Sequence, residues 1–149
     1  MGQNASTARS AYDAWNARDF DRFAELFKSG EIVMVGSDTT LPGSDGARQF
    51  AEMWAGGFPD GRVTIDNVFE RDGGVAIEYT GRGTQTGVLQ TPMGAIDPTG
   101  KSIELKLCDT WTFSSDGAPT QMKTYFDTGS LMTQLGVAAP QMAGAGISS

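Results

Sequence analysis

Apolar residues in the first third of the chain recur at the spacing of helices. Ala8, Tyr12 and Trp15 lie four and three positions apart, which places them on one helical face. A second, shorter helix is predicted after Asp19, which can cap its first turn, and a third is predicted to start from a cap at residues 44–45. The pattern therefore indicates a helical N-terminal part of the chain.

Beyond Pro59 the apolar positions change from helical spacing to the alternation of strands. Strands are predicted over 62–71, 75–82, 101–113 and 120–127, with an earlier short strand over 31–36. The alternation slips near Asp66, as it does at a β-bulge, and the segments 37–43 and 88–100 are predicted to be loops. Helices followed by hairpin-linked strands indicate an α+β fold, with an antiparallel sheet covered on one face.

The length of 149 residues fits one domain, which we assign to residues 1–136. A final short helix is predicted over 130–135. The segment 137–149 is rich in Ala, Gly and Ser and has few side chains that can pack. It is therefore predicted to be a flexible C-terminal tail.

The charge and hydropathy of the chain argue against several partners. Its 18 acidic and 11 basic residues give a net charge of −7, which repels phosphate backbones, so we expect no nucleic-acid partner. No apolar run approaches the roughly 20 residues that cross a bilayer, and the N-terminal residues lack the basic and apolar regions of a secretory signal. We therefore expect a cytoplasmic protein with no membrane partner.

The chain has no histidine and a single cysteine, Cys108. Histidine is the commonest general base near neutral pH and the usual ligand of catalytic zinc, so mechanisms that depend on it are excluded. A lone cysteine provides neither an internal disulfide nor a cysteine-based zinc site, and within a strand it usually packs as a small apolar residue. We expect no metal site, and acid–base chemistry falls to Asp, Glu, Tyr, Lys or Cys.

One carboxylate interrupts the apolar face of the strand over 101–113. Asp109 shares this face with Ile103, Leu105, Leu107, Trp111 and Phe113. Burial among apolar side chains raises the pKa of a carboxyl toward the range that suits general acid–base catalysis, which makes Asp109 the first catalytic candidate. The alternatives are that a Tyr, Arg or backbone partner holds it in a structural role, or that a bulge turns it to solvent.

Two further strand faces carry ionisable side chains. Lys123, Tyr125 and Asp127 alternate along one side of the last strand and form a polar patch if that side faces a pocket. The alternative is an exposed strand face, with Asp127 capping the helix that follows. Arg82 lies on a polar side of the strand over 75–82, where it can pair with a carboxylate of a neighbouring strand or, as is more frequent for such a face, contact solvent.

Several stretches of the sequence carry a family resemblance. They are Gly43-Ser-Asp-Gly46 with the helix that ends at Trp54, the segments 58–67 and 78–87, and Tyr125-Phe-Asp127 with Gln134-Leu-Gly136. Together they resemble the SnoaL-like polyketide cyclase family, which belongs to the wider superfamily of nuclear transport factor two, ketosteroid isomerase and limonene epoxide hydrolase. The resemblance extends over nearly the whole chain, from about Ala8 to Gly136.

The resemblance implies a cone, in which a curved, mostly antiparallel sheet encloses an apolar pocket closed by three N-terminal helices. It also implies a homodimer and chemistry without a cofactor, in which pocket carboxylates transfer protons during aldol ring closure or isomerisation. The protein is then expected to be a cyclase-like lyase or isomerase whose partner is a small hydrophobic carbonyl compound.

The resemblance also suggests roles for individual residues. Asp109 and Asp127 are the candidate acid–base groups. Polar side chains that would position substrate oxygens are Tyr12, Tyr125, Arg82 and Gln85, the last at a position where related sequences commonly carry a histidine. Aromatic side chains that would form the walls of the pocket are Trp15, Phe27, Trp54 and Trp111.

Two other functions are compatible with these residues. The same pocket can bind a hydrophobic ligand or a partner without catalysis, and ligand binding without conversion would support this function. Epoxide hydration instead requires two carboxylates and an arginine around one water. It therefore needs Asp109, Asp127 and Arg82 within hydrogen-bond reach of a common point, and separated side chains would exclude it.

Overall fold

The computed structural model describes residues 2–137, which form four helices and eight strands. The helices are α1 (Gln3–Asn16), α2 (Phe20–Glu25), α3 (Gly43–Gly57) and α4 (Thr128–Leu135). The strands are β1 (Glu31–Met34), β2 (Thr39–Pro42), β3 (Arg62–Arg71), β4 (Gly74–Thr84), β5 (Leu89–Thr91), β6 (Gly94–Ile96), β7 (Ser102–Phe113) and β8 (Pro119–Phe126). The predicted tail, apart from Val137, lies outside the described residues.

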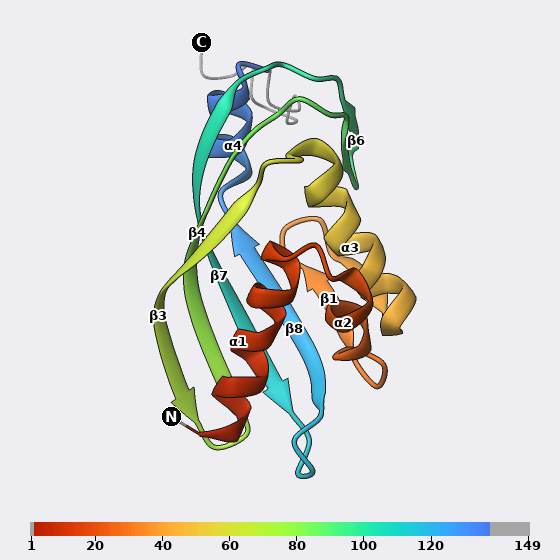
Figure 1. Cartoon of the computed structure of the whole chain (residues 1–149), viewed down its shortest axis with the longest axis vertical. Helices are drawn as coiled ribbons and strands as arrows, with labels where there is room; N and C mark the ends of the chain where they lie inside the picture. The colour runs from red at the N-terminus through yellow and green to blue at the C-terminus, as the bar shows by residue number, and fades with distance from the viewer. Residues whose placement is uncertain (1, 138–149) are drawn as a thin grey trace, which may run out of the picture.

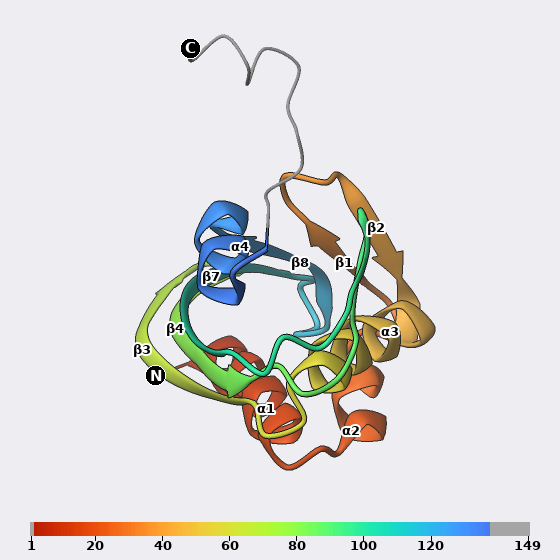
Figure 2. The same cartoon turned by 90° about the horizontal axis from the view of Figure 1, so that it is seen from above.

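Six strands form one curved sheet in the order β2-β1-β8-β7-β4-β3. Neighbouring strands are antiparallel except for β1 and β8, which run parallel. Figure 1 shows α1 lying along the concave side of the sheet. Figure 2 shows the sheet wrapping around the interior, with α1, α2 and α3 on the side that the sheet leaves open. The predicted α+β cone is therefore confirmed.

The curvature of the sheet has a local cause in β3. The register of β3 against β4 shifts between Ile65 and Asn67, which is the β-bulge predicted near Asp66. A bulge adds one residue to one strand and increases its bend and twist. Gly73, with a φ of 72°, forms the tight turn that joins the two strands. The bent hairpin can thereby curve around α1.

Two segments predicted to be loops contain short strands. The segment 37–43 includes β2, which pairs with β1 after a reversal in which Gly36 and Asp38 adopt positive φ angles. The segment 88–100 contains the hairpin of β5 and β6, with Gly94 at a φ of 127° in its turn. Strands of three or four residues are too short for their alternation to be recognised in the sequence.

The helices pack as their apolar spacing predicts. Along α1 the buried face combines four alanines with Tyr12 and Trp15, so the small residues let the helix approach the sheet closely. Asp19 caps α2 as predicted, because its side chain accepts a hydrogen bond from the backbone N–H of Arg22 at 3.2 Å. The third helix differs from the prediction, since it begins at Gly43 without a side-chain cap.

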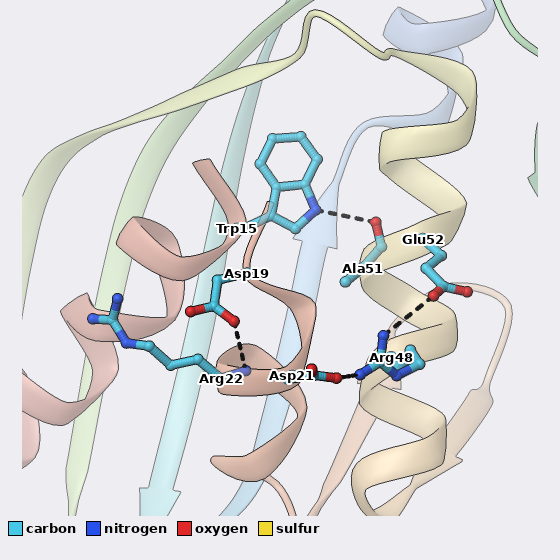
Figure 3. A network of polar contacts seen from close by, with 7 residues as sticks. All are labelled: Trp15, Asp19, Asp21, Arg22, Arg48, Ala51 and Glu52. Carbon is cyan, nitrogen blue, oxygen red and sulfur yellow. Dashed lines mark hydrogen bonds and ion pairs between the residues drawn. The ribbon is translucent and has the colours of Figure 1, made fainter. Parts of the chain in front are cut away.

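Polar contacts join the three N-terminal helices into one cover (Figure 3). The indole Nε1 of Trp15 in α1 donates a hydrogen bond to the backbone oxygen of Ala51 in α3 at 3.1 Å. Arg48 of α3 pairs with Asp21 of α2 and with Glu52. Because exposed ion pairs contribute little to stability, the buried bond of Trp15 stabilises this cover more than the ion pairs of Arg48 do.

The apolar core has two parts. The larger part lies between the N-terminal helices and the concave side of the sheet. The smaller part lies toward α4 and the β5–β6 hairpin, and its buried members are Phe58, Leu89, Ile103, Leu105, Leu131 and Leu135. Side chains of both parts border the cavity described next.

Candidate active site

Asp109 lies near the middle of β7 with only 2% of its surface exposed. The hydroxyl of Tyr12 donates a hydrogen bond to its Oδ2 at 2.6 Å, and the hydroxyl of Tyr79 donates one to its Oδ1 at 3.1 Å. The indole Nε1 of Trp111 in turn donates to the hydroxyl oxygen of Tyr12 at 3.1 Å. Each carboxylate oxygen therefore has one tyrosine donor.

Strand register and helix spacing bring these side chains together. Asp109 pairs with Ile77 across β4 and β7, and Tyr79 lies two residues along β4 on the same face as Ile77. Tyr12 reaches the carboxylate from the buried face of α1. A strand, its neighbour and a packed helix thus each supply one member of the group.

A cavity of mainly apolar lining adjoins Asp109. The space open to the centre of a water molecule is about 80 Å³, whereas roughly 10–15 Å³ is enough for one water. All three N-terminal helices contribute aromatic side chains to its wall, as the predicted closure by three helices requires. Its lining residues are Ala11, Tyr12, Trp15, Phe23, Phe50, Trp54, Phe58, Gly61, Arg62, Val63, Tyr79, Gly81, Arg82, Ile103, Leu105, Leu107, Asp109, Trp111 and Met122.

Burial controls the ionisation of this group. Loss of hydration raises the pKa of Asp109 from 3.8 to about 6, although the hydroxyls of Tyr12, Thr124 and Tyr79 act in the opposite direction. Burial, followed by the negative charge of Asp109, raises the pKa of both tyrosines well above 10.0. The tyrosines therefore keep their protons and remain donors, while the carboxyl can change its charge near neutral pH.

Sequence reasoning missed two members of this group, Tyr79 and Thr124. Tyr79 follows Val75 and Ile77 on the apolar face of β4, and this alternation was the available signal. Thr124 is directly opposite Asp109 in the pairing of β7 with β8 and is fully buried. Its signal was weaker, because a threonine in a strand is common and only the register places it beside the carboxylate.

The predicted aromatic wall is present in part. Trp15, Trp54 and Trp111 border the cavity, as does Tyr12. Phe27 does not border it, although it is fully buried and packs against Trp111 with ring centroids 5.2 Å apart. Phe27 therefore supports the wall from behind.

Gln85 has a different environment from the other polar candidates. It is fully buried and does not line the cavity. Its side-chain amide donates to the backbone oxygens of Gly87, Ile96 and Asp97, and its side-chain oxygen accepts hydrogen bonds from Thr99. These contacts secure the ends of the segment that carries the β5–β6 hairpin.

Three predicted site residues form no hydrogen bond or ion pair with Asp109. Asp127 is exposed and caps α4, because its side chain accepts a hydrogen bond from the backbone N–H of Ser130. Tyr125 is 39% exposed on the outer side of β8. Arg82 is exposed and borders the cavity, and its Nε donates to Glu104 at 3.1 Å. The carboxylate pair with a bridging arginine that epoxide hydration requires is therefore not formed by the residues described.

No group of three or more Cys, Asp or Glu side chains within residues 2–137 is arranged to hold a metal ion. Within the same range no helix has the length and apolar character to cross a membrane.

Solved structures of similar fold cover most of the chain. A protein from Jannaschia sp. CCS1, provisionally described as a SnoaL-like polyketide cyclase, has a TM-score of 0.79 at 23% identity, with 93% of this chain and 94% of that chain covered. IdmH from Streptomyces antibioticus, provisionally a polyketide cyclase, has a TM-score of 0.73 at 24% identity, with 91% and 100% covered. TerC, co-crystallized with polyporic acid, has a TM-score of 0.71 at 18% identity, with 91% and 99% covered.

Of the two sequence comparisons, the one with family models identifies a family. No curated protein sequence matches the chain. The family model for the SnoaL-like domain matches residues 8–122, a range that includes Tyr12, Tyr79 and Asp109. The chain, with its curved sheet, its helical cover and its buried carboxylate, belongs to the SnoaL-like domain family.

Proposed function

We propose that the protein is an acid–base enzyme that acts on a small hydrophobic carbonyl compound, with Asp109 as the group that accepts and returns the proton. The observation that carries this proposal is the sheltered carboxyl at the cavity wall, with a pKa raised to about 6 and a tyrosine hydroxyl on each oxygen. A base with a pKa near the working pH combines ionisation with proton affinity, which is what general base catalysis requires.

The proton transfer balances without a further reactant. The carboxylate of Asp109 takes a proton from the carbon next to the substrate carbonyl, and the electron pair of that C–H bond forms an enolate. A tyrosine hydroxyl that turns from Asp109 to the enolate oxygen stabilises its charge. Protonated Asp109 then returns the proton to another carbon in an isomerisation. In an aldol closure the enolate carbon attacks a second carbonyl, and the proton goes to the new alkoxide.

The apolar lining supports this reaction in two ways. Aromatic and aliphatic side chains favour a ligand of the same character and exclude water from the enolate. The family and the structural neighbours also agree with a small-molecule ligand, since TerC was crystallized with polyporic acid and IdmH is provisionally a polyketide cyclase. Ring closure or isomerisation within one molecule requires no bound cofactor, and none is included in the proposal.

The test is the exchange of carbon-bound protons in a simple ketone. 1-Tetralone in D2O, followed by proton NMR, loses its α-proton signal when a base removes and returns protons. We expect the protein to accelerate this loss, with a rate that rises with pH, is half-maximal near pH 6 and levels off about one pH unit higher. Asp109→Asn is expected to lower the protein-dependent rate by about 10²-fold or more.

The matched control is the same change at the exposed carboxylate. Asp127→Asn keeps a good helix cap, so α4 and the exchange rate are expected to be retained. Equal rates for the wild-type protein and Asp109→Asn would contradict the proposal. Saturable binding of 1-tetralone with no exchange would favour the second candidate, a binding module for hydrophobic ligands, for which the apolar cavity alone is sufficient.

A further inference from the structure

The buried side-chain donors Tyr12, Tyr79, Trp111 and Trp15 of the cavity wall already have acceptors. Tyr12 and Tyr79 donate to Asp109, and Trp111 donates to Tyr12. The indole of Trp15 donates to a backbone oxygen of α3. Arg62 and Arg82 also border the cavity, but both are exposed, so a ligand oxygen in the buried part beside Asp109 must draw one of these donors away from its present partner.

The buried hydroxyl of Thr124, which lies beside this group, has no hydrogen-bond partner among the described residues. Thr124 lies opposite Asp109 in the β7–β8 pairing, and it shares the concave face of β8 with Met122, which lines the cavity. Thr124 is fully buried, and its Oγ1 completes no hydrogen bond with the described residues. It is nevertheless close enough to Asp109 and to the hydroxyl of Tyr79 to act on the pKa of each in the downward direction. Buried polar groups without a partner are rare in folded proteins, so this one calls for an explanation.

We propose that Thr124 is a reserve donor to Asp109: its hydroxyl hydrogen-bonds the carboxylate when Tyr12 or Tyr79 turns its own hydroxyl to a ligand oxygen. The inference rests on the proposed function for the identity of the ligand oxygen, but the exchange of donors is a property of the protein itself. It makes Thr124 a positioning residue that acts through Asp109.

The chemistry of threonine suits this role. Rotation of the side chain about χ1 moves Oγ1 and its proton, so the hydroxyl can be brought to the carboxylate without movement of the backbone. The pairing of β7 with β8 holds Thr124 at a constant distance along the sheet from Asp109. A carboxylate that loses one of two donors in an apolar site takes up a proton more readily, and a replacement donor prevents this change.

The surroundings of Asp109 contain few other groups that can complicate a titration. The titratable side chains in contact with it are Tyr12 from α1 and Tyr79 from β4, and both keep their protons well above neutral pH. Cys108 is its neighbour in the chain on the opposite face of β7, and burial raises the pKa of that thiol. No Lys, Arg or Glu of the described residues forms a hydrogen bond or ion pair with Asp109.

The test removes a tyrosine donor without any ligand. Tyr79→Phe reproduces the loss that a ligand oxygen would cause, and Thr124→Val removes the reserve hydroxyl while it keeps the branched shape of the side chain. The pKa of Asp109 is measured by ¹³C NMR in the wild-type protein, in both single variants and in the double variant. Such a cycle isolates the coupling between the two hydroxyls.

We expect each single variant to raise the pKa of Asp109 by less than half a pH unit, because one hydroxyl compensates for the other. The double variant is expected to raise it by about one pH unit more than the sum of the single changes, which corresponds to the loss of a hydrogen bond to a charged group. Additive changes would overturn the proposal, as would a large shift in Thr124→Val alone. The latter would mean that Thr124 is a permanent donor.

Two controls separate this role from a structural one. Thr124→Ser keeps the hydroxyl, so in the Tyr79→Phe background it is expected to return the pKa of Asp109 to the value of that single variant. If Thr124→Val impairs folding in the double variant, Thr124→Ala in the same background provides the same comparison. Because the titration uses no ligand, a negative result leaves the ketone-exchange test of the proposed function untouched, and the reverse also holds.

Discussion

Replacement of Asp109 by asparagine is expected to change how the stability of the protein depends on pH. The folded carboxyl has a pKa of about 6, whereas the unfolded one titrates near 3.8. Between these values the folded state holds a proton that the unfolded state has lost. The contribution of Asp109 to stability is therefore fully present below about pH 4 and is lost as the pH rises through 6.

The magnitude follows from the two pKa values. They differ by about two pH units, and one unit corresponds to about 1.4 kcal/mol, so the free energy of unfolding should fall by roughly 3 kcal/mol from this group alone. Asparagine has nearly the same shape and does not titrate, so the variant lacks this dependence.

The assay is urea unfolding of the wild-type protein and Asp109→Asn, followed by circular dichroism from pH 4 to pH 8. Other titrating groups are common to both proteins and cancel in the difference between their free energies of unfolding. We expect this difference to change by roughly 3 kcal/mol in favour of the variant between pH 4 and pH 7, and to be constant above that range. A difference that does not vary with pH, or that favours the wild-type protein as the pH rises, would refute the reasoning.

Tyr12→Phe removes a donor from Asp109 and leaves the indole N–H of Trp111 buried without an acceptor. The pKa of Asp109 should therefore rise, and ketone exchange at pH 6 should fall several-fold. Chemical denaturation should show a free energy of unfolding lower by about 1–3 kcal/mol. Gly81 lines the cavity, and a Cβ added there makes only ordinary van der Waals contacts. Gly81→Val should therefore retain the fold but occupy part of the cavity, so the affinity for 1-tetralone should fall at least tenfold by calorimetry. Unchanged affinity would mean that the ligand binds elsewhere. Gln85→Ala should lower stability by about 1–3 kcal/mol without moving the pH midpoint of exchange, because the amide supports the hairpin segment and not the cavity. The homodimer implied by the family resemblance should appear at twice the 15.8 kDa chain mass in sedimentation equilibrium, and a monomer would exclude it.

Periodicity predicted the parts of the site that lie on long, clearly patterned elements. The helical spacing of Tyr12 and the alternation around Asp109 were both visible in the sequence, and each determines a buried face. The bulge near Asp66 was visible as a slip in the alternation. These features depend on the local geometry of one helix or strand, which can be inferred from the spacing of apolar residues within that segment.

Features that depend on pairing between distant segments were not predictable in the same way. The register of β4 against β7 places Tyr79 beside Asp109, and a shift of one residue would turn it to the other face. In β8 both faces carry polar residues, so the pattern did not show that Thr124 faces inward while Tyr125 faces outward. Asp127 follows the end of β8, where a cap for α4 and a pocket carboxylate have the same sequence signal.

The central claim is that Asp109 is a carboxyl sheltered from water that exchanges its proton near neutral pH. The most direct measurement is the titration of its side-chain carboxyl by ¹³C NMR in the wild-type protein, with Asp109→Asn to assign the signal. We predict a midpoint near pH 6. A midpoint at or below the ordinary value of about 4 would contradict the account, because the carboxyl would then be hydrated or held permanently in its charged form.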